Sequence, residues 1–225
     1  METSIQPEGR TVVNSGAFAT LRRLASARRG PAQERCELCH RPIPPEHRHL
    51  LEIASHKITC SCDACALRFE GVIEGRFALI PRDVHTLPDF QLDDTQWADL
   101  ALPIELAFLV HSTPAGRMLA LYPSPAGATE SLLSLDAWDQ IVAANPMLAP
   151  MQSDVEALLI NRVGDRRLYY LAPIDVCFEL VGLMRTHWRG LSGGEEVWRE
   201  IDAFFTRLEE RAQPLVPEPA EAPRA

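Results

Sequence analysis

Two Cys-x2-Cys pairs near the amino end constrain the fold of this chain more than any other feature. The pairs are Cys36–Cys39 and Cys62–Cys65, with twenty-two residues between them. Each pair can form a tight knuckle in which backbone amides hydrogen-bond to the sulfurs. Four thiolates are the ligand set of a closed, tetrahedral structural zinc site. The sequence therefore predicts a structural Zn²⁺ at Cys36, Cys39, Cys62 and Cys65, with no open position for catalysis.

Other interpretations of the same cysteines remain open. Two knuckles can hold a single iron, as in rubredoxin-like electron carriers, or part of an iron–sulfur cluster. Disulfides or free thiols are a further alternative. Cys60 lies two residues before Cys62 and could replace it as a ligand. The Cys-x2-Cys geometry favours Cys62, so we interpret Cys60 as a strand-end thiol or a spare sulfur.

Four histidines lie between the two pairs and could also bind metal. With four thiolates already present, we expect them to be solvated or to lie behind the metal ligands. They are His40, His47, His49 and His56. A sixth cysteine, Cys177, stands in an apolar helical pattern and is expected to be a small buried hydrophobe.

The 225 residues are enough for a small metal module and one domain with its own core. We predict a disordered amino terminus over 1–31, with a short amphipathic helix at 17–29. The four-Cys zinc module, treble-clef or ribbon-like, is expected over 32–75. An α+β domain follows over 76–212, and a disordered tail rich in Pro, Ala and Glu over 213–225.

Two predicted hairpins decide the fold class of the larger domain. Strand-like runs at 104–111 and 117–122 form the first, and runs at 155–163 and 167–171 the second. Helices are expected between and after them, at about 136–145, at 174–188 and after a capping box at Ser192–Glu195; another capping box starts at Asp93. Hairpins interspersed with helices indicate an α+β fold with an antiparallel sheet.

The net charge and the composition of individual segments limit the cell compartment and the binding partners that we expect for this protein. The net charge is −9, and an acidic body repels phosphate, so nucleic acid is an unfavoured partner despite the arginines at 22–29. No apolar stretch is long enough to span a membrane, and residues 1–10 do not resemble a secretory signal. Thiolate knuckles without an export signal favour the reducing cytoplasm.

A search for catalytic motifs finds none of the common phosphate-binding, dinucleotide-binding, nucleophile-elbow or zinc-protease patterns. We therefore expect a protein that is not an enzyme. Two segments are candidates for contact with a ligand or partner. The loop at 122–131 offers Ser124, Thr129, Glu130 and Ser131, and the helix end at 187–194 offers Arg189. A plain connector between a strand and a helix explains the first segment more simply, and a cation near the carboxyl end of a helix explains Arg189 without any function.

Several longer strings together resemble a known bacterial family. They are Cys-Glu-Leu-Cys-x-x-Pro-Ile-Pro-Pro-Glu-His-Arg-His-Leu at 36–50, Cys-x-Cys-x-x-Cys at 60–65, Tyr-Pro-Ser-Pro-Ala-Gly-Ala-Thr-Glu-Ser at 122–131 and His-Trp-Arg-Gly-Leu-Ser-Gly-Gly at 187–194. The chain is identified on these strings as similar, over residues 34–211, to the domain-of-unknown-function family numbered 5947. His40 stands where the family pattern has a glycine, which indicates a position of positive φ.

The resemblance implies an accessory role, because members of that family are often encoded near genes of nickel–iron uptake hydrogenases. It implies a protein partner, such as the hydrogenase or its maturation machinery, and implies no reaction. Two functions are consistent with these sequence features. The first is a non-enzymatic zinc-binding accessory protein, and the second is a rubredoxin-like iron-binding electron carrier that uses the same thiolates. A zinc-ribbon regulator that touches nucleic acid is a weaker third.

Overall fold

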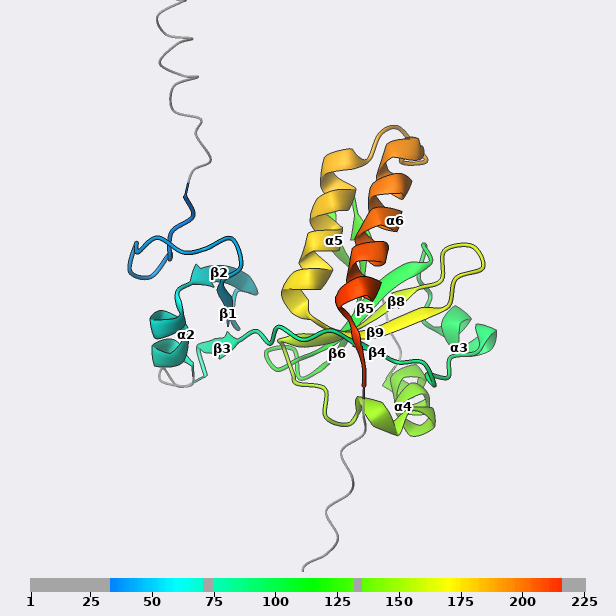
Figure 1. The fold of residues 1–225 in the computed structure, drawn as a ribbon. Coiled ribbons are helices and arrows are strands. Elements are labelled where there is room, and N and C mark those ends of the chain that lie inside the picture. Colours follow the sequence, from blue (N-terminus) through cyan, green and yellow to red (C-terminus); the bar gives the residue numbers. More distant parts are fainter. Residues whose placement is uncertain (1–32, 71–74, 132–134, 216–225) are drawn as a thin grey trace, which may run out of the picture.

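A small antiparallel sheet with one helix beside it and a larger, mostly antiparallel sheet flanked by several helices make up the described part of the protein (Figure 1). The computed structural model describes residues 33–70, 75–131 and 135–215. The predicted helix at 17–29 and most of the predicted tail lie outside these residues. The predicted α+β class is confirmed: antiparallel strands and helices alternate along the chain, and the four knuckle cysteines gather in its amino-terminal part.

The smaller sheet is three-stranded, with strand order β2-β1-β3. Strand β1 (Arg48–Glu52) forms a hairpin with β2 (Lys57–Ser61), and β3 (Phe77–Leu79) pairs with the other edge of β1. Helix α2 (Asp63–Phe69) follows β2 directly. Since β3 belongs to this sheet, the amino-terminal unit continues past residue 75, where we expected the metal module to end.

The larger sheet has seven strands in the order β10-β4-β9-β8-β5-β6-β7. The strands are β4 (His85–Thr86), β5 (Leu106–Ser112), β6 (Arg117–Ser124), β7 (Gly127–Ser131), β8 (Glu156–Asn161), β9 (Leu168–Pro173) and β10 (Gln213–Pro214). Both predicted hairpins are present, β5–β6 and β8–β9, and β5 joins them by pairing antiparallel with β8. The last strand lies inside the predicted tail, because Gln213 and Pro214 pair in parallel with β4.

Both faces of this sheet are buried, and successive side chains along a strand point to opposite faces. On β5, the side chains of Leu106, Phe108 and Val110 pack toward one face, and those of Ala107 and Leu109 toward the other. The two-residue period of a strand separates the two sets. A sheet covered on both sides requires nearly continuous apolar strands, which explains the apolar runs at 106–110 in β5 and 157–160 in β8.

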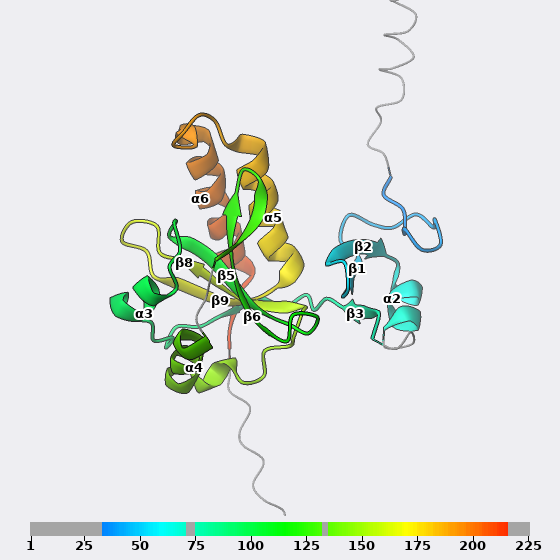
Figure 2. The ribbon, with the colours of Figure 1, turned by 180° about the vertical axis from the view of Figure 1, so that it is seen from behind.

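Helices from different parts of the chain cover the two faces. Helices α5 (Ile174–His187) and α6 (Gly194–Arg211) pack together on one face, visible in yellow and orange in Figure 1. Helix α4 (Leu135–Ala144), the short 3-10 helix η1 (Pro146–Leu148) and the segment around α3 (Asp94–Asp99) cover the other (Figure 2).

The two predicted capping boxes have different outcomes. Asp93 caps α3 as expected: its side chain accepts a hydrogen bond from the Gln96 amide, and the Gln96 side chain accepts one from the Asp93 amide. The predicted box at Ser192–Glu195 is wrong. Gly193 is the N-cap of α6, at φ 87°, and no side chain caps the helix. The Arg189 amide donates to the Gly193 carbonyl at 2.9 Å, which curls the chain into a turn instead.

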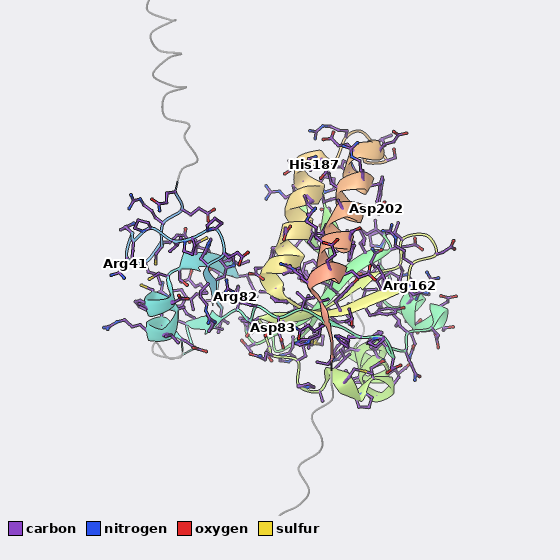
Figure 3. The ribbon with its side chains drawn as sticks, in the orientation of Figure 1. Arg41, Arg82, Asp83, Arg162, His187 and Asp202 are labelled. Atoms are coloured by element: carbon purple, nitrogen blue, oxygen red, sulfur yellow. The ribbon has the colours of Figure 1, made fainter. Side chains whose placement is uncertain are left out.

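The amino-terminal unit shares the core of the larger domain. Leu51 on β1 is fully buried in the apolar cluster beneath α5 and α6, and Ile58 on β2 packs against the same cluster. Ile80 and Val84, on the segment that leaves β3, are buried there too. Between them, Arg82 and Asp83 mark the stretch of chain that links the two sheets (Figure 3).

Candidate metal centre

The structure brings all four knuckle cysteines to one point. The sulfurs of Cys36, Cys39, Cys62 and Cys65 lie within 4.8 Å of one another. The Cys39 and Cys62 sulfurs, one from each knuckle, are 3.7 Å apart. Sulfurs that share a tetrahedral zinc at 2.3 Å lie about 3.8 Å apart, so this pair already has the spacing of a common ion. The cluster could therefore hold one metal ion.

The first knuckle is shaped by backbone hydrogen bonds around Cys36. The His40 amide donates to the Cys36 carbonyl at 2.8 Å, and the Cys36 amide donates to the Arg41 carbonyl at 2.8 Å. These bonds close a tight turn and require a left-handed residue at its end. His40 has φ 61°, so the positive φ that the sequence indicated at this position is confirmed.

The second knuckle is the amino end of a helix. Cys62 is the N-cap of α2, and Cys65 lies in its first turn. The Ala66 amide donates to the Cys62 carbonyl at 2.9 Å, which is the first hydrogen bond of the helix. The order of knuckle, hairpin and helix is the one expected of a treble-clef-like module. Cys62, and not Cys60, supplies the sulfur at this end of the cluster.

The local environment lowers the pKa of one knuckle cysteine and raises the pKa of another. Burial acts to raise the pKa of Cys36, but hydrogen bonds with the backbone at Cys62, Cys39 and Leu38 lower that pKa to about 6. Burial, followed by hydrogen bonds to its three cysteine neighbours, raises the pKa of Cys65 to about 12. Four thiolates packed this closely repel one another, and a bound cation offsets that repulsion.

All six cysteines of the chain are free thiols. Cys177 is buried in the larger core on α5, as expected, and burial raises the pKa of its thiol well above the usual range. Cys60 has a different setting. It pairs across the β1–β2 hairpin with His49, and its sulfur lies within 4.8 Å of the ring nitrogens of His47 and His49.

This second cluster was missed by the sequence interpretation, which treated the histidines as solvated or as lying behind the zinc ligands. The positions of these three residues in the sequence already indicated that they could meet. Residues 47 and 49 are two apart and share one face of an extended chain, and a hairpin places Cys60 opposite. In the part of the chain that the structure describes, His40 and His56 belong to neither cluster.

The segment at 122–131 is a β-hairpin and not the strand-to-helix loop that we predicted. Residues 127–131 form β7, and Tyr122 pairs with Thr129. Glu130 forms an ion pair with Arg117 at 2.5 Å, with its side chain 40% exposed. Thr129 is half-buried, and its hydroxyl lies 2.9 Å from that of Ser124.

Arg189 is exposed, and its Nη1 donates to the carbonyls of Thr186 and Trp188 at 2.9 Å. It therefore closes the end of α5 and does not contact Glu130, which borders a cavity with Ile174 and Phe178 near the start of that helix. Glu130 and Arg189 therefore lie near different ends of α5.

These features define a class of protein: an α+β domain joined to a treble-clef-like unit with a four-cysteine cluster that could hold a metal. The chain belongs to the family of unknown function DUF5947, which it matches over residues 35–212. No curated protein and no solved structure matches it. Within the described residues, each helix is too short or too polar to cross a lipid bilayer.

Proposed function

We propose that this chain is a zinc-binding accessory protein without catalytic activity of its own. It docks on a redox enzyme such as a nickel–iron hydrogenase, or on the machinery that assembles one. The observation that supports the zinc site is the convergence of Cys36, Cys39, Cys62 and Cys65 from two knuckles, with a sulfur spacing suited to a tetrahedral ion. Four protein ligands leave no coordination site for a substrate.

The zinc ion has a structural task in this proposal. The apolar cluster around it is small: Ile43 is buried beside Cys36 and Cys65, and Leu38 and Phe69 pack against it. A unit with so little apolar burial derives its order from the metal. Free thiols remain available for this task in the reducing cytoplasm, where we place the protein.

The partner is inferred from the family resemblance, and the contact surface from exposure. Glu130 and Arg189 are exposed side chains on the two family strings at 122–131 and 187–194. Segments of this kind, held by a rigid sheet and a helix end, are suited to contact a protein partner.

Metal analysis with an absorption spectrum tests the metal. Zinc in the wild-type protein, with one equivalent fewer in Cys36→Ser/Cys39→Ser, is the expected result. A red protein with thiolate-to-iron absorption bands would favour the rubredoxin-like electron carrier instead.

Affinity capture of the tagged full chain from its native host tests the partner. We expect a redox-enzyme subunit or an assembly factor, with reduced recovery for Glu130→Ala/Arg189→Ala. The matched control is Arg199→Ala, an exposed arginine on α6. Equal recovery with all three proteins would exclude the proposed contact surface.

A further inference from the structure

We propose that His47, His49 and Cys60 form a second metal site, separate from the four-cysteine cluster. Their ligand atoms lie within 4.8 Å of one another, and the two Nε2 atoms are 3.2 Å apart. Two imidazole nitrogens that share a tetrahedral zinc at about 2.05 Å are separated by about 3.3 Å. The histidine pair therefore already has the spacing of ligands to one ion.

The hydrogen bonds on the far side of each ring determine which nitrogen is free. His47 Nδ1 lies 2.9 Å from the Pro44 carbonyl and 3.1 Å from the Pro45 carbonyl. Both partners are acceptors, so this nitrogen must carry the proton. In the neutral ring, the lone pair is then on Nε2, which faces His49.

His49 has the same arrangement with a stronger partner. Its Nδ1 lies 2.6 Å from Asp175 Oδ2, a carboxylate on the first turn of α5. An ionised carboxylate only accepts hydrogen bonds, so Nδ1 carries the proton and the lone pair is on Nε2. A carboxylate behind a ligating histidine is a frequent partner in metal sites, where it orients the ring and raises its basicity.

Two lone pairs that face each other at 3.2 Å repel unless a proton or a metal ion lies between them, and either one leaves the hydrogen bonds on the far side of both rings in place. A cation between them removes the conflict. Cys60 supplies a third ligand of a soft type from the neighbouring strand. Two imidazoles and a thiolate are suited to a divalent transition-metal ion, with zinc favoured.

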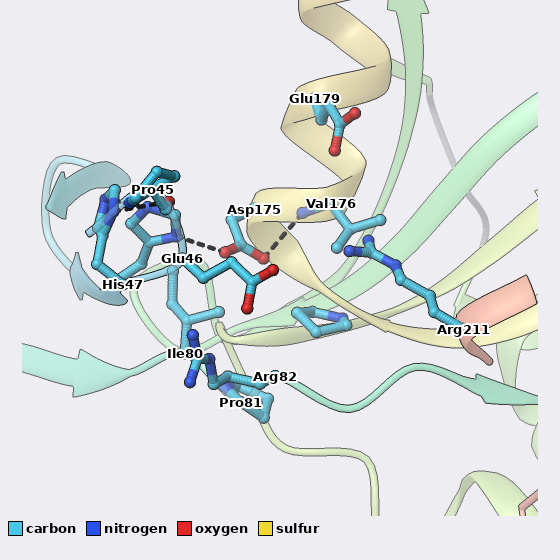
Figure 4. A pocket seen from close by; sticks show the side chains of 12 residues that line it. Pro45, Glu46, His47, Ile80, Pro81, Arg82, Asp175, Val176, Glu179 and Arg211 are labelled. Carbon is cyan, nitrogen blue, oxygen red and sulfur yellow. Dashed lines mark hydrogen bonds and ion pairs between the residues drawn. The ribbon is translucent and has the colours of Figure 1, made fainter. Parts of the chain in front are cut away.

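The second site differs from the four-cysteine cluster in its open coordination position. Three protein ligands leave a fourth position for water or another exchangeable ligand. His47 and His49 border a cavity of about 580 Å³ between the amino-terminal unit and the start of α5 (Figure 4). Glu46, Arg82 and Arg211 line the same cavity, so a small polar ligand could reach the ion through it.

Titration of the metal-free full chain with Co²⁺ in the presence of a competing chelator tests this proposal. We expect two binding events per chain in the wild-type protein. One should give the strong absorption of a four-thiolate site, and the other the weaker thiolate absorption of a single cysteine. A single event in the wild-type protein would overturn the proposal, whatever the behaviour of the variants.

Variants then assign the second event to these residues. His47→Ala/His49→Ala and Cys60→Ser should each weaken the second event at least tenfold and leave the four-thiolate absorption intact. That intact absorption also shows that the unit still folds. His56→Asn is the matched control, since His56 is exposed on the β1–β2 turn and should leave both events unchanged. If the double-histidine variant retained both events, the histidines would share a proton and not a metal ion.

Discussion

His49 and Asp175 are 126 residues apart in the chain, and a 2.6 Å hydrogen bond joins them. The bond links strand β1 of the amino-terminal unit to the first turn of α5 in the larger domain. Both side chains are largely shielded, with exposures of 28% and 22%. This hydrogen bond fixes the position of the second cluster relative to the core of the larger domain.

Asp175→Ala should weaken binding at the second site by about tenfold or more, because carboxylates behind ligating histidines contribute that much to metal affinity. The four-cysteine site should be unaffected. Co²⁺ titration measures both affinities in one experiment. Asp83→Ala is the control, since Asp83 is exposed on the connecting segment. Equal weakening of both sites would mean that the variant disturbs the whole unit and that Asp175 has no specific role.

Chelation should unfold the amino-terminal unit and leave the larger domain folded but less stable, because the cluster around the metal is small whereas the larger core keeps most of its residues when Leu51 leaves it. Limited proteolysis followed by mass spectrometry should then yield a resistant fragment. The fragment should begin near Ile80, which is buried in the larger core. Digestion of the larger domain at the same rate as the smaller one would contradict this independence.

Leu51→Ala should destabilise the larger domain although the residue belongs to the smaller sheet. Its side chain is fully buried in the main core, and truncation of such a leucine costs about 2–5 kcal/mol. Urea unfolding followed by tryptophan fluorescence measures the change. Leu67→Ala on α2 is the control, since Leu67 is 69% exposed and should change stability by less than about 0.5 kcal/mol.

Gly193→Ala should destabilise the protein by about 1–3 kcal/mol, because the residue has φ 87° and a left-handed position strains any residue with a Cβ. That Cβ would also lie 2.9 Å from Trp188 and from Val197. Gly182→Ala in α5 is the matched control. It has open space around it and should stabilise the helix by about 0.5–1 kcal/mol. Similar thermal midpoints for the two variants would contradict this assignment.

The buried Glu156 should make stability fall as pH rises. Burial raises the pKa of its carboxyl above 4.5, although a hydrogen bond from the Gln152 amide opposes this. The folded state then binds the proton more tightly than the unfolded state. Its contribution is therefore present at low pH and is lost as pH rises from about 4.5 through the raised value.

Glu156→Gln keeps an acceptor for the Gln152 amide and removes the titration. As pH rises from 4 to 7, the free energy of unfolding of the variant should increase relative to that of wild type, as measured by urea unfolding at each pH. Glu52→Gln is the opposite case. Hydrogen bonds from Ser55 and Arg76 lower the pKa of Glu52, so the wild-type protein gains stability as pH rises through the acidic range. Glu52→Gln lacks this gain and should therefore become less stable relative to wild type as pH rises.

Local patterns accounted for much of the fold. Alternation and turn residues predicted the β5–β6 and β8–β9 hairpins, and the spacing of Asp93 and Gln96 predicted the start of α3. These features depend on interactions a few residues apart. The strand at 127–131 was not predictable in this way. Its sequence, Gly-Ala-Thr-Glu-Ser, has little strand propensity, and its pairing with β6 determines its conformation.

The same distinction separates the two candidate metal sites. The sequence by itself determined the four-cysteine set, because each Cys-x2-Cys pair is a local turn that directs two sulfurs to one side. Only the tertiary structure decided the role of the histidines. The hairpin register places Cys60 opposite His49, and the packing of α5 places Asp175 behind that ring. The position of Asp175 is not encoded in residue spacing, because it depends on which surfaces of two distant segments bury each other.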